Sequence, residues 1–159
     1  MIPFPDKKYN IIYADPPWSY NENWGNGAVH HHYDSMSLNE LKDLPVEKIS
    51  AENCHLYLWY TNSFVREAHQ ICDAWGFTYK QTLTWVKLNS NKKPEMGLGY
   101  YFRGTTEHIL FGVKGKLPRI NKSLINLLEY DGVAIYEKNN QNHSEKTNKC
   151  KDMKIKISE

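Results

Sequence analysis

A short apolar segment that ends in Asp15-Pro16-Pro17-Trp18 constrains the fold more than any other part of the sequence. Residues 11–14 are β-branched, aromatic or small, without polar interruption, which is typical of a strand covered on both faces in a parallel sheet. Pro16 and Pro17 have no backbone N–H and fix φ, so the strand must stop there. We expect a rigid turn at the carboxyl end of a strand, where open α/β sheets bind their ligands.

The residue types in this turn suit the recognition of an amine. The Asp15 carboxylate and the Pro16 carbonyl are two acceptors for one NH₂ group, and Trp18 offers a flat face for a nucleobase. The exocyclic amine of a base taken out of its stack matches all three. Two other interpretations are a strand-to-turn junction with a solvated Asp and a core Trp, and a nucleotide triphosphatase whose Asp binds Mg²⁺. The second requires a G-x-x-x-x-G-K-[ST] loop, which the sequence lacks.

Composition indicates one globular domain. The chain has 159 residues, of which 40% are hydrophobic and 13% aromatic, and the aromatic excess would also suit base stacking. The net charge of +2 neither requires nor excludes nucleic acid. Three scattered cysteines without a C-x-x-C motif predict free thiols in a reducing, cytoplasmic location. We find no signal-peptide core and no apolar run that could span a bilayer.

Two helices are predicted by local signals. Ser37 and Glu40 form a capping box, so a helix should cover residues 38–44. Apolar side chains fall on one helical stripe within residues 64–75, and Gly76 predicts the end of that helix.

Strands are predicted over residues 54–61, 77–87 and 107–113, and residues 46–50 read as a connector. The helix between the first two strands makes a β-α-β unit, so those strands should be parallel.

The Asp-Pro-Pro-Trp motif resembles the catalytic motif of the MT-A70 family of S-adenosylmethionine-dependent adenine-N6 methyltransferases. Further segments agree with the order and approximate spacing of this family, and together they cover residues 8–121. They are His32-Tyr33-Asp34-Ser35-Met36-Ser37, Leu56-Tyr57-Leu58-Trp59-Tyr60-Thr61-Asn62, Trp85-Val86-Lys87, Phe102-Arg103-Gly104 followed by Glu107-His108, and Gly112-Val113-Lys114-Gly115. The ordered set is far more specific than the four-residue motif alone.

The resemblance implies a Rossmann-like α/β methyltransferase fold with a mainly parallel sheet and flanking helices. We expect residues 1–137 to form the methyltransferase-like domain and residues 138–159 to form a polar, divergent tail. The family continues with a His-Ser-x-Lys-Pro segment, whereas here Thr147 follows His143-Ser144-Glu145-Lys146. The segment that would hold the cofactor's ribose and adenine is not visible, so the fold is expected to be incomplete at this end and to bind the cofactor weakly or not at all.

The same resemblance implies roles for individual residues. Asp15, Pro16, Pro17 and Trp18 would carry catalysis, and Asp15 and Lys87 would contact S-adenosylmethionine. Lys87 follows a predicted strand, so the alternative for it is an ordinary surface lysine with a partly buried stem.

Substrate contacts are expected from a loop rich in Asn and Gly that follows the motif. In the family the matching loop gates the adenine pocket, so Tyr20 and Trp24 become candidate base contacts, and His32 and Tyr33 belong to its gate or rim. A plain surface loop is the alternative. Arg103 would contact a phosphate or a carboxylate, or would instead pair with Glu107 or another structural acid.

No metal site is expected. In His30-His31-His32 consecutive side chains point in different directions and do not converge on one ion.

The expected function is S-adenosylmethionine-dependent methyl transfer to the N6 amine of adenine in nucleic acid, with DNA favoured over RNA. The expected partners are adenine-containing DNA or RNA and a second subunit in a homo- or hetero-oligomer. The alternative is an inactive relative that acts as a nucleic-acid-binding or partner subunit. The intact motif at residues 15–18 favours the enzyme, and the missing cofactor segment favours the alternative.

Overall fold

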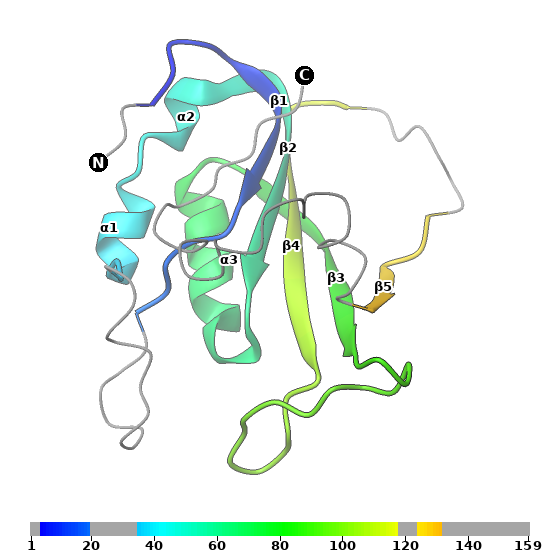
Figure 1. Cartoon of the computed structure of the whole chain (residues 1–159). Coiled ribbons are helices and arrows are strands. Elements are labelled where there is room, and N and C mark those ends of the chain that lie inside the picture. The colour runs from blue at the N-terminus through cyan, green and yellow to red at the C-terminus, as the bar shows by residue number, and fades with distance from the viewer. Residues whose placement is uncertain (1–3, 20–34, 118–123, 132–159) are drawn as a thin grey trace, which may run out of the picture.

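The computed structural model describes residues 4–19, 35–117 and 124–131, and their five strands form one sheet with the order β1-β2-β4-β3-β5 (Figure 1). The strands are β1 (Tyr9–Ala14), β2 (Ser50–Tyr60), β3 (Thr78–Leu88), β4 (Thr106–Lys114) and β5 (Leu127–Asp131). The predicted strands are therefore confirmed with boundaries that differ by a few residues. β5 was not predicted.

Four of these strands run in one direction. β1 pairs in parallel with β2, and β3 pairs in parallel with β5, whereas β4 is antiparallel to both of its neighbours. The expected mainly parallel α/β sheet is confirmed. β2 and β3 are parallel as expected, but β4 lies between them. The sequence did not predict this strand order, because the pairing of β4 with both strands depends on contacts distant in sequence.

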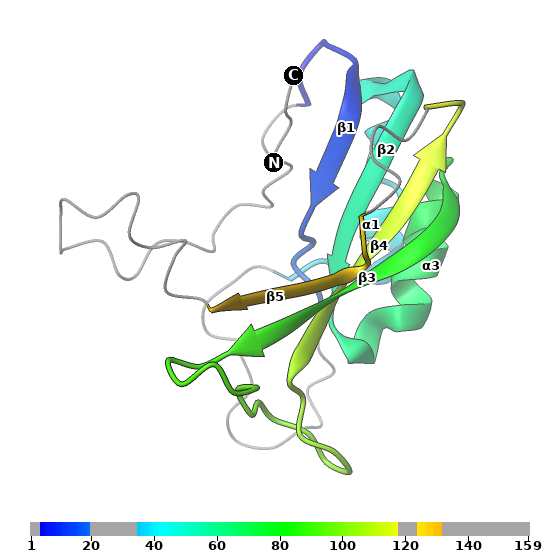
Figure 2. The same cartoon turned by 90° about the vertical axis from the view of Figure 1, so that its right-hand side faces the viewer.

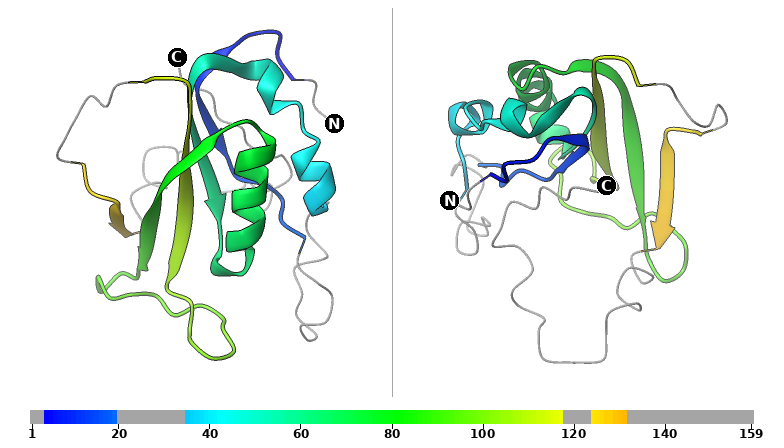
Figure 3. Two further views of the ribbon diagram at one scale, coloured as in Figure 1. Left: turned by 180° about the vertical axis from the view of Figure 1, so that it is seen from behind. Right: turned by 90° about the horizontal axis from the view of Figure 1, so that it is seen from above.

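The described helices lie on one face of the sheet (Figures 2 and 3). They are α1 (Leu38–Lys42), α2 (Val46–Ile49) and α3 (Val65–Ala74), and the short 3₁₀ turn η2 (Asn62–Phe64) leads into α3. Alternate residues of β2 point toward them, and Cys54, Leu56 and Leu58 are fully buried. The opposite face of the sheet therefore carries the other residues of each strand.

The capping box that predicts α1 is present. The backbone N–H of Ser37 donates to Glu40 Oε2 at 2.8 Å, and the N–H of Glu40 donates to Ser37 Oγ at 3.3 Å. The helix ends at Lys42, two residues earlier than expected. The connector predicted at residues 46–50 is wrong, because residues 46–49 form the helical turn α2, whose Val46 and Ile49 are buried in the core.

The predicted stripe of α3 packs against the sheet and against α1, except for Val65, which is exposed. Ala68, Ile71 and Cys72 are fully buried, and the indole N–H of Trp75 donates to the carbonyl of Leu41 at 2.9 Å. Gly76 ends the helix at φ 78°, a conformation that glycine adopts without steric cost. The hydrogen bond between Trp75 and Leu41 fixes α3 relative to α1. It also fixes the end of β2, which directly precedes η2 and α3.

Several expectations fall partly or wholly outside the described residues. Residues 138–159 and Cys150 are among these, so the expected domain boundary stays a prediction. Cys54 and Cys72 are buried free thiols, as expected. Within the described part of the chain, no helix is long and apolar enough to cross a membrane, and no group of acidic, His or Cys side chains could hold a metal ion.

Candidate active site

The carboxyl ends of β1, β2 and β3 meet at one edge of the sheet, where β4 begins (Figure 1, lower end). Asp15 follows β1 directly, Lys87 is the penultimate residue of β3, and Glu107 is the second residue of β4. Strand topology thus brings three charged residues from distant parts of the sequence to one edge.

Two backbone hydrogen bonds fix the Asp-Pro-Pro-Trp turn, one within the turn and one to the segment that precedes α1. The N–H of Trp18 donates to the carbonyl of Pro16 at 2.9 Å, and the N–H of Met36 donates to the carbonyl of Pro17 at 2.9 Å. Pro16 is itself buried. The expected rigid turn is therefore present, and the Pro16 carbonyl keeps one lone pair for a further donor.

Trp18 is an internal anchor of this turn. Its ring stacks on Phe64 with a centroid distance of 4.8 Å and an interplanar angle of 15°. Its indole N–H donates to the carbonyl of Trp59 at 3.3 Å. One face of the indole is consequently occupied by protein, and only the other face remains for the base stacking expected from the sequence.

Asp15 presents a carboxylate without a hydrogen-bond or ion-pair partner among the described residues. The residue reaches the surface, yet the surrounding protein removes part of its water shell. This desolvation raises the pKa of the Asp15 carboxyl, and the negative charge of Glu107 raises it further. An unpaired acid with a raised pKa in a rigid turn is typical of a functional site rather than a structural one.

Lys87 and Glu107 form an ion pair across β3 and β4. The Lys87 ammonium also lies 5.4 Å from the centroid of the Trp85 ring, and Trp85 is directly opposite Glu107 in the strand register. Both charged side chains are partly exposed. Lys87 is therefore held by an acid and an aromatic ring at the sheet edge rather than extended freely into solvent.

A row of aromatic rings crosses the sheet between these charges, on the face opposite the helices. Tyr13 meets Trp59 edge-on at 6.1 Å, and Trp59 meets Trp85 edge-on at 5.5 Å. The indole N–H of Trp59 is buried and has no hydrogen-bond partner within the described residues. Asp15 at one end and the Lys87–Glu107 pair at the other thus flank an apolar floor that carries one unused donor.

The sequence-predicted substrate residues divide into two groups. Tyr20, Trp24, His32 and Tyr33 lie outside the described residues. Arg103 lies in the loop between β3 and β4, and it does not pair with Glu107, whose acid group is taken by Lys87. The alternative in which Arg103 pairs with Glu107 is therefore wrong.

Glu107 was not predicted as a site residue. Its relation to Lys87 and Asp15 depends on the register of β3 and β4, which no local pattern specifies. The available signals were the Glu107-His108 segment, which follows the order of the family, and the position of Glu107 at the start of a predicted strand.

Comparison with known proteins decides the family. A model of the MT-A70 family matches residues 9–159. The chain belongs to the MT-A70 family. The match continues to the end of the chain, so the resemblance is wider than the motif segments, which stop at residue 121.

Relatives in this family include catalytic and non-catalytic proteins. The type II methyltransferase M.MunI of a Mycoplasma species is 33% identical over 133 residues, covering 72% of this chain and 54% of M.MunI. The N(6)-adenine-specific methyltransferase METTL4 of Mus musculus is 28% identical over 120 residues, covering 70% of this chain and 24% of METTL4. The N6-adenosine-methyltransferase non-catalytic subunit MTB of Arabidopsis thaliana is 29% identical over 119 residues, covering 70% of this chain and 15% of MTB. The MT-A70 chain thus spans about half the length of M.MunI and a smaller part of the other two.

Proposed function

We propose that this chain carries the catalytic motif of an S-adenosylmethionine-dependent methyltransferase that modifies the N6 amine of adenine in nucleic acid. The observation that carries the proposal is the carboxylate of Asp15, which has no partner among the described residues, in a turn fixed by backbone hydrogen bonds. Family membership and the relatives named as adenine or adenosine methyltransferases support the choice of adenine.

The residues at the sheet edge fit the proposed cofactor. S-adenosylmethionine, when bound, supplies a methyl group on a positively charged sulfur. The carboxylate of Asp15 favours a nearby cation, whereas Glu107 and the ring of Trp85 already contact the Lys87 ammonium. Lys87 would pair with the carboxylate of the cofactor, and the unused indole N–H of Trp59 would donate to an acceptor on a bound molecule.

Asp15 and the Pro16 carbonyl would orient the amine of the target base. Each accepts one N–H, so the nitrogen lone pair is held in one direction and transfer depends on proximity and alignment. As the new bond between nitrogen and the methyl carbon forms, the bond from that carbon to the sulfonium would break with its electron pair going to sulfur, and the nitrogen would lose a proton. The raised pKa of Asp15 suits a carboxylate that receives this proton, because proton acceptance is more favourable when the acid formed is weaker.

The decisive experiment measures incorporation of labelled methyl groups from S-adenosylmethionine into single-stranded oligonucleotides. Asp15→Asn should abolish transfer to adenine-containing strands, whereas Asp73→Asn, an exposed acid on α3, should not. Asp15→Asn should leave the fold stable at neutral pH, because ionisation of a carboxyl whose pKa is raised in the folded state disfavours folding above that pKa. Wild-type turnover by Asp15→Asn would refute the catalytic role.

We propose DNA as the substrate in preference to RNA. The assay therefore uses DNA and RNA strands of the same sequence, together with adenine-free strands that contain cytosine. Equal labelling of the adenine-free strands would overturn the choice of adenine, since the N4 amine of cytosine offers similar chemistry to the same acceptors.

A second candidate function is a non-catalytic subunit of a methyltransferase complex. The relative MTB, named as such a subunit, covers nearly as much of this chain as M.MunI does. Isothermal titration with S-adenosylmethionine separates the two functions. Stoichiometric low-micromolar binding supports the enzyme, whereas no binding together with no activity in the wild type supports the subunit.

A further inference from the structure

Residues 89–105 form an arm that extends beyond the sheet between β3 and β4 (Figure 1, green loop at the lower end). At the base of the arm, the N–H of Glu95 donates to the carbonyl of Lys87 at 2.7 Å. Farther out, the N–H of Gly97 donates to the carbonyl of Gly104 at 2.7 Å. These bonds define an arm tip, residues 97–104, that is closed on itself and attached to the strand that carries Lys87.

Glycine is required to close the arm tip. A Cβ atom at Gly99 would lie 1.8 Å from the carbonyl oxygen of Phe102, and one at Gly97 would lie 2.8 Å from that of Gly104. Backbone oxygens cannot move away as side chains can, so any other residue at position 99 would open the turn. The tight turn leaves no room inside for the side chains between its ends.

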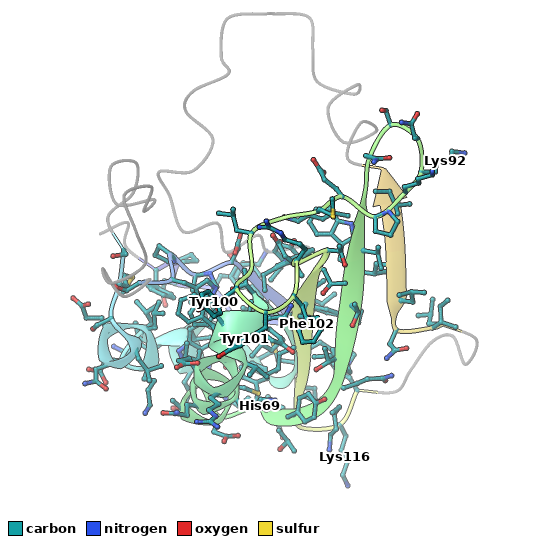
Figure 4. All side chains as sticks on the ribbon, turned by 90° about the horizontal axis from the view of Figure 1, so that it is seen from below. His69, Lys92, Tyr100, Tyr101, Phe102 and Lys116 are labelled. Atoms are coloured by element: carbon teal, nitrogen blue, oxygen red, sulfur yellow. The ribbon has the colours of Figure 1, made fainter. Side chains whose placement is uncertain are left out.

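The arm tip consequently directs large apolar side chains into solvent. Tyr100, Tyr101 and Phe102 are 81%, 86% and 88% exposed, and Leu98 is 92% exposed (Figure 4). The rings of Tyr100 and Tyr101 contact each other edge-on at 4.9 Å. An exposed group of apolar side chains of this size marks an interaction surface rather than ordinary surface composition.

The charge of the arm favours an anionic partner. Residues 89–105 contain the basic residues Lys92, Lys93 and Arg103 and one acidic residue, Glu95. Arg103 follows the three aromatic residues directly, and its guanidinium makes no ion pair within the described part of the chain. Aromatic rings beside an unpaired arginine are the combination that single-stranded nucleic acid requires, with bases on the rings and a phosphate on the arginine.

A network of side-chain hydrogen bonds orients the amide group of Asn62, which lines a hollow beside the arm tip. An open hollow of about 610 Å³ is lined by Asn62 and by residues 100–104 of the arm tip. His108 Nε2 donates to Asn62 Oδ1 at 2.7 Å, and Thr84 Oγ1 lies 3.2 Å from His108 Nδ1. Burial lowers the pKa of His108, which favours the neutral ring that this pattern needs. With Oδ1 engaged, the amide NH₂ of Asn62 is available to donate to the edge of a base.

We propose that the arm tip binds the single-stranded nucleotides that flank the target base, with bases stacked on Tyr100, Tyr101 and Phe102 and a phosphate on Arg103. The inference rests on the proposed function for the identity of the target base. The arm tip and Asp15 belong to the same end of the sheet, so one strand of nucleic acid would contact both.

Fluorescence anisotropy measures the affinity of the protein for labelled single-stranded oligonucleotides. The measurement is made without S-adenosylmethionine, so it tests the inference independently of catalysis. Tyr101→Ala and Phe102→Ala should each weaken binding by about tenfold, as expected for the loss of one stacked base. Arg103→Gln should lower the dependence of log affinity on log salt by about 0.7, the value for one phosphate contact with a single strand. Leu124→Ala, at an exposed apolar residue outside the arm, and Lys116→Gln, beyond the other end of β4, are matched controls that should change neither quantity.

Each outcome has one meaning. Wild-type affinity and salt dependence in all three arm-tip variants would overturn the inference. If the wild type self-associates in sedimentation experiments and the arm-tip variants do not, while their affinity for nucleic acid is unchanged, the arm tip is a protein interface and the inference is overturned. DNA and RNA strands of the same sequence identify which nucleic acid is preferred. If the arm-tip variants weaken binding while no protein form transfers methyl groups, the inference stands and the proposed function fails.

Discussion

Replacement of Trp18 distinguishes a residue that holds the motif in place from one that only contacts the base. In the structure the indole stacks on Phe64 and donates to the carbonyl of Trp59. We therefore expect Trp18→Ala to destabilise the folded protein even when no nucleic acid is present. A residue that only stacked on a base would leave the free energy of unfolding unchanged.

The expected loss follows from the contacts of the indole. Truncation of a fully buried Trp to Ala costs about 3–5 kcal/mol, and this indole is half-buried, so we expect roughly 2 kcal/mol from packing, including the stacked ring. The hydrogen bond is long at 3.3 Å and adds about 0.5 kcal/mol, at the lower end for a neutral bond. The sum for Trp18→Ala is about 2–3 kcal/mol, and Trp18→Phe, which keeps a ring on Phe64, should lose about 1 kcal/mol or less.

Urea denaturation followed by far-ultraviolet circular dichroism measures both variants, because this signal does not depend on the fluorescence of the replaced indole. A double-mutant cycle with Phe64→Ala should give a coupling free energy of about 0.5–1.5 kcal/mol for the stacked pair. A Trp18→Ala protein within about 0.5 kcal/mol of wild-type stability, together with weaker nucleic-acid binding, would refute the anchoring role.

Three further predictions follow from other contacts. Glu107→Gln should move the acid limb of the activity profile to lower pH, because removal of its negative charge lowers the raised pKa of Asp15 and keeps the carboxylate ionised; a limb that stays in place would contradict their coupling. Gly99→Ala should weaken single-strand binding while circular dichroism and urea unfolding stay as in the wild type, because the atoms nearest to a Cβ at this position are backbone atoms of Phe102 and Arg103, both within the arm tip. The Cys72 thiol should react with iodoacetamide at mildly alkaline pH only after unfolding, since burial raises its pKa to about 12, and rapid labelling of the native protein, read by mass spectrometry, would show that this part of α3 opens.

Local signals predicted the parts of the fold that local physics determines. The Ser37–Glu40 capping box lies within one turn of helix, and the apolar stripe of α3 repeats within three turns, so both are visible in short segments. The turn at residues 15–18 was predicted for the same reason, because two consecutive prolines fix its backbone.

The remaining features depend on pairing across the sheet. The position of β4 between β2 and β3, the pairing of Lys87 with Glu107 and the stacking of Trp18 on Phe64 each join residues at least 20 positions apart. A sequence pattern identifies residues that suit a strand or a site but does not give the strand order or register that brings them together. α2 was missed because a single helical turn after a proline is too short to show a periodic pattern.

The position of β4 also has a consequence for folding of the chain during its synthesis on the ribosome. β2 and β3 are both synthesised before β4. The side of each strand that faces the middle of the sheet forms its backbone hydrogen bonds with β4. Until residue 114 has left the exit tunnel, both strands carry rows of unpaired backbone groups, which are a known route to association with other chains. We expect the nascent chain to depend on fast emergence of β4 or on chaperone protection during that interval, and a stall placed between β3 and β4 should increase aggregation more than one placed after β4.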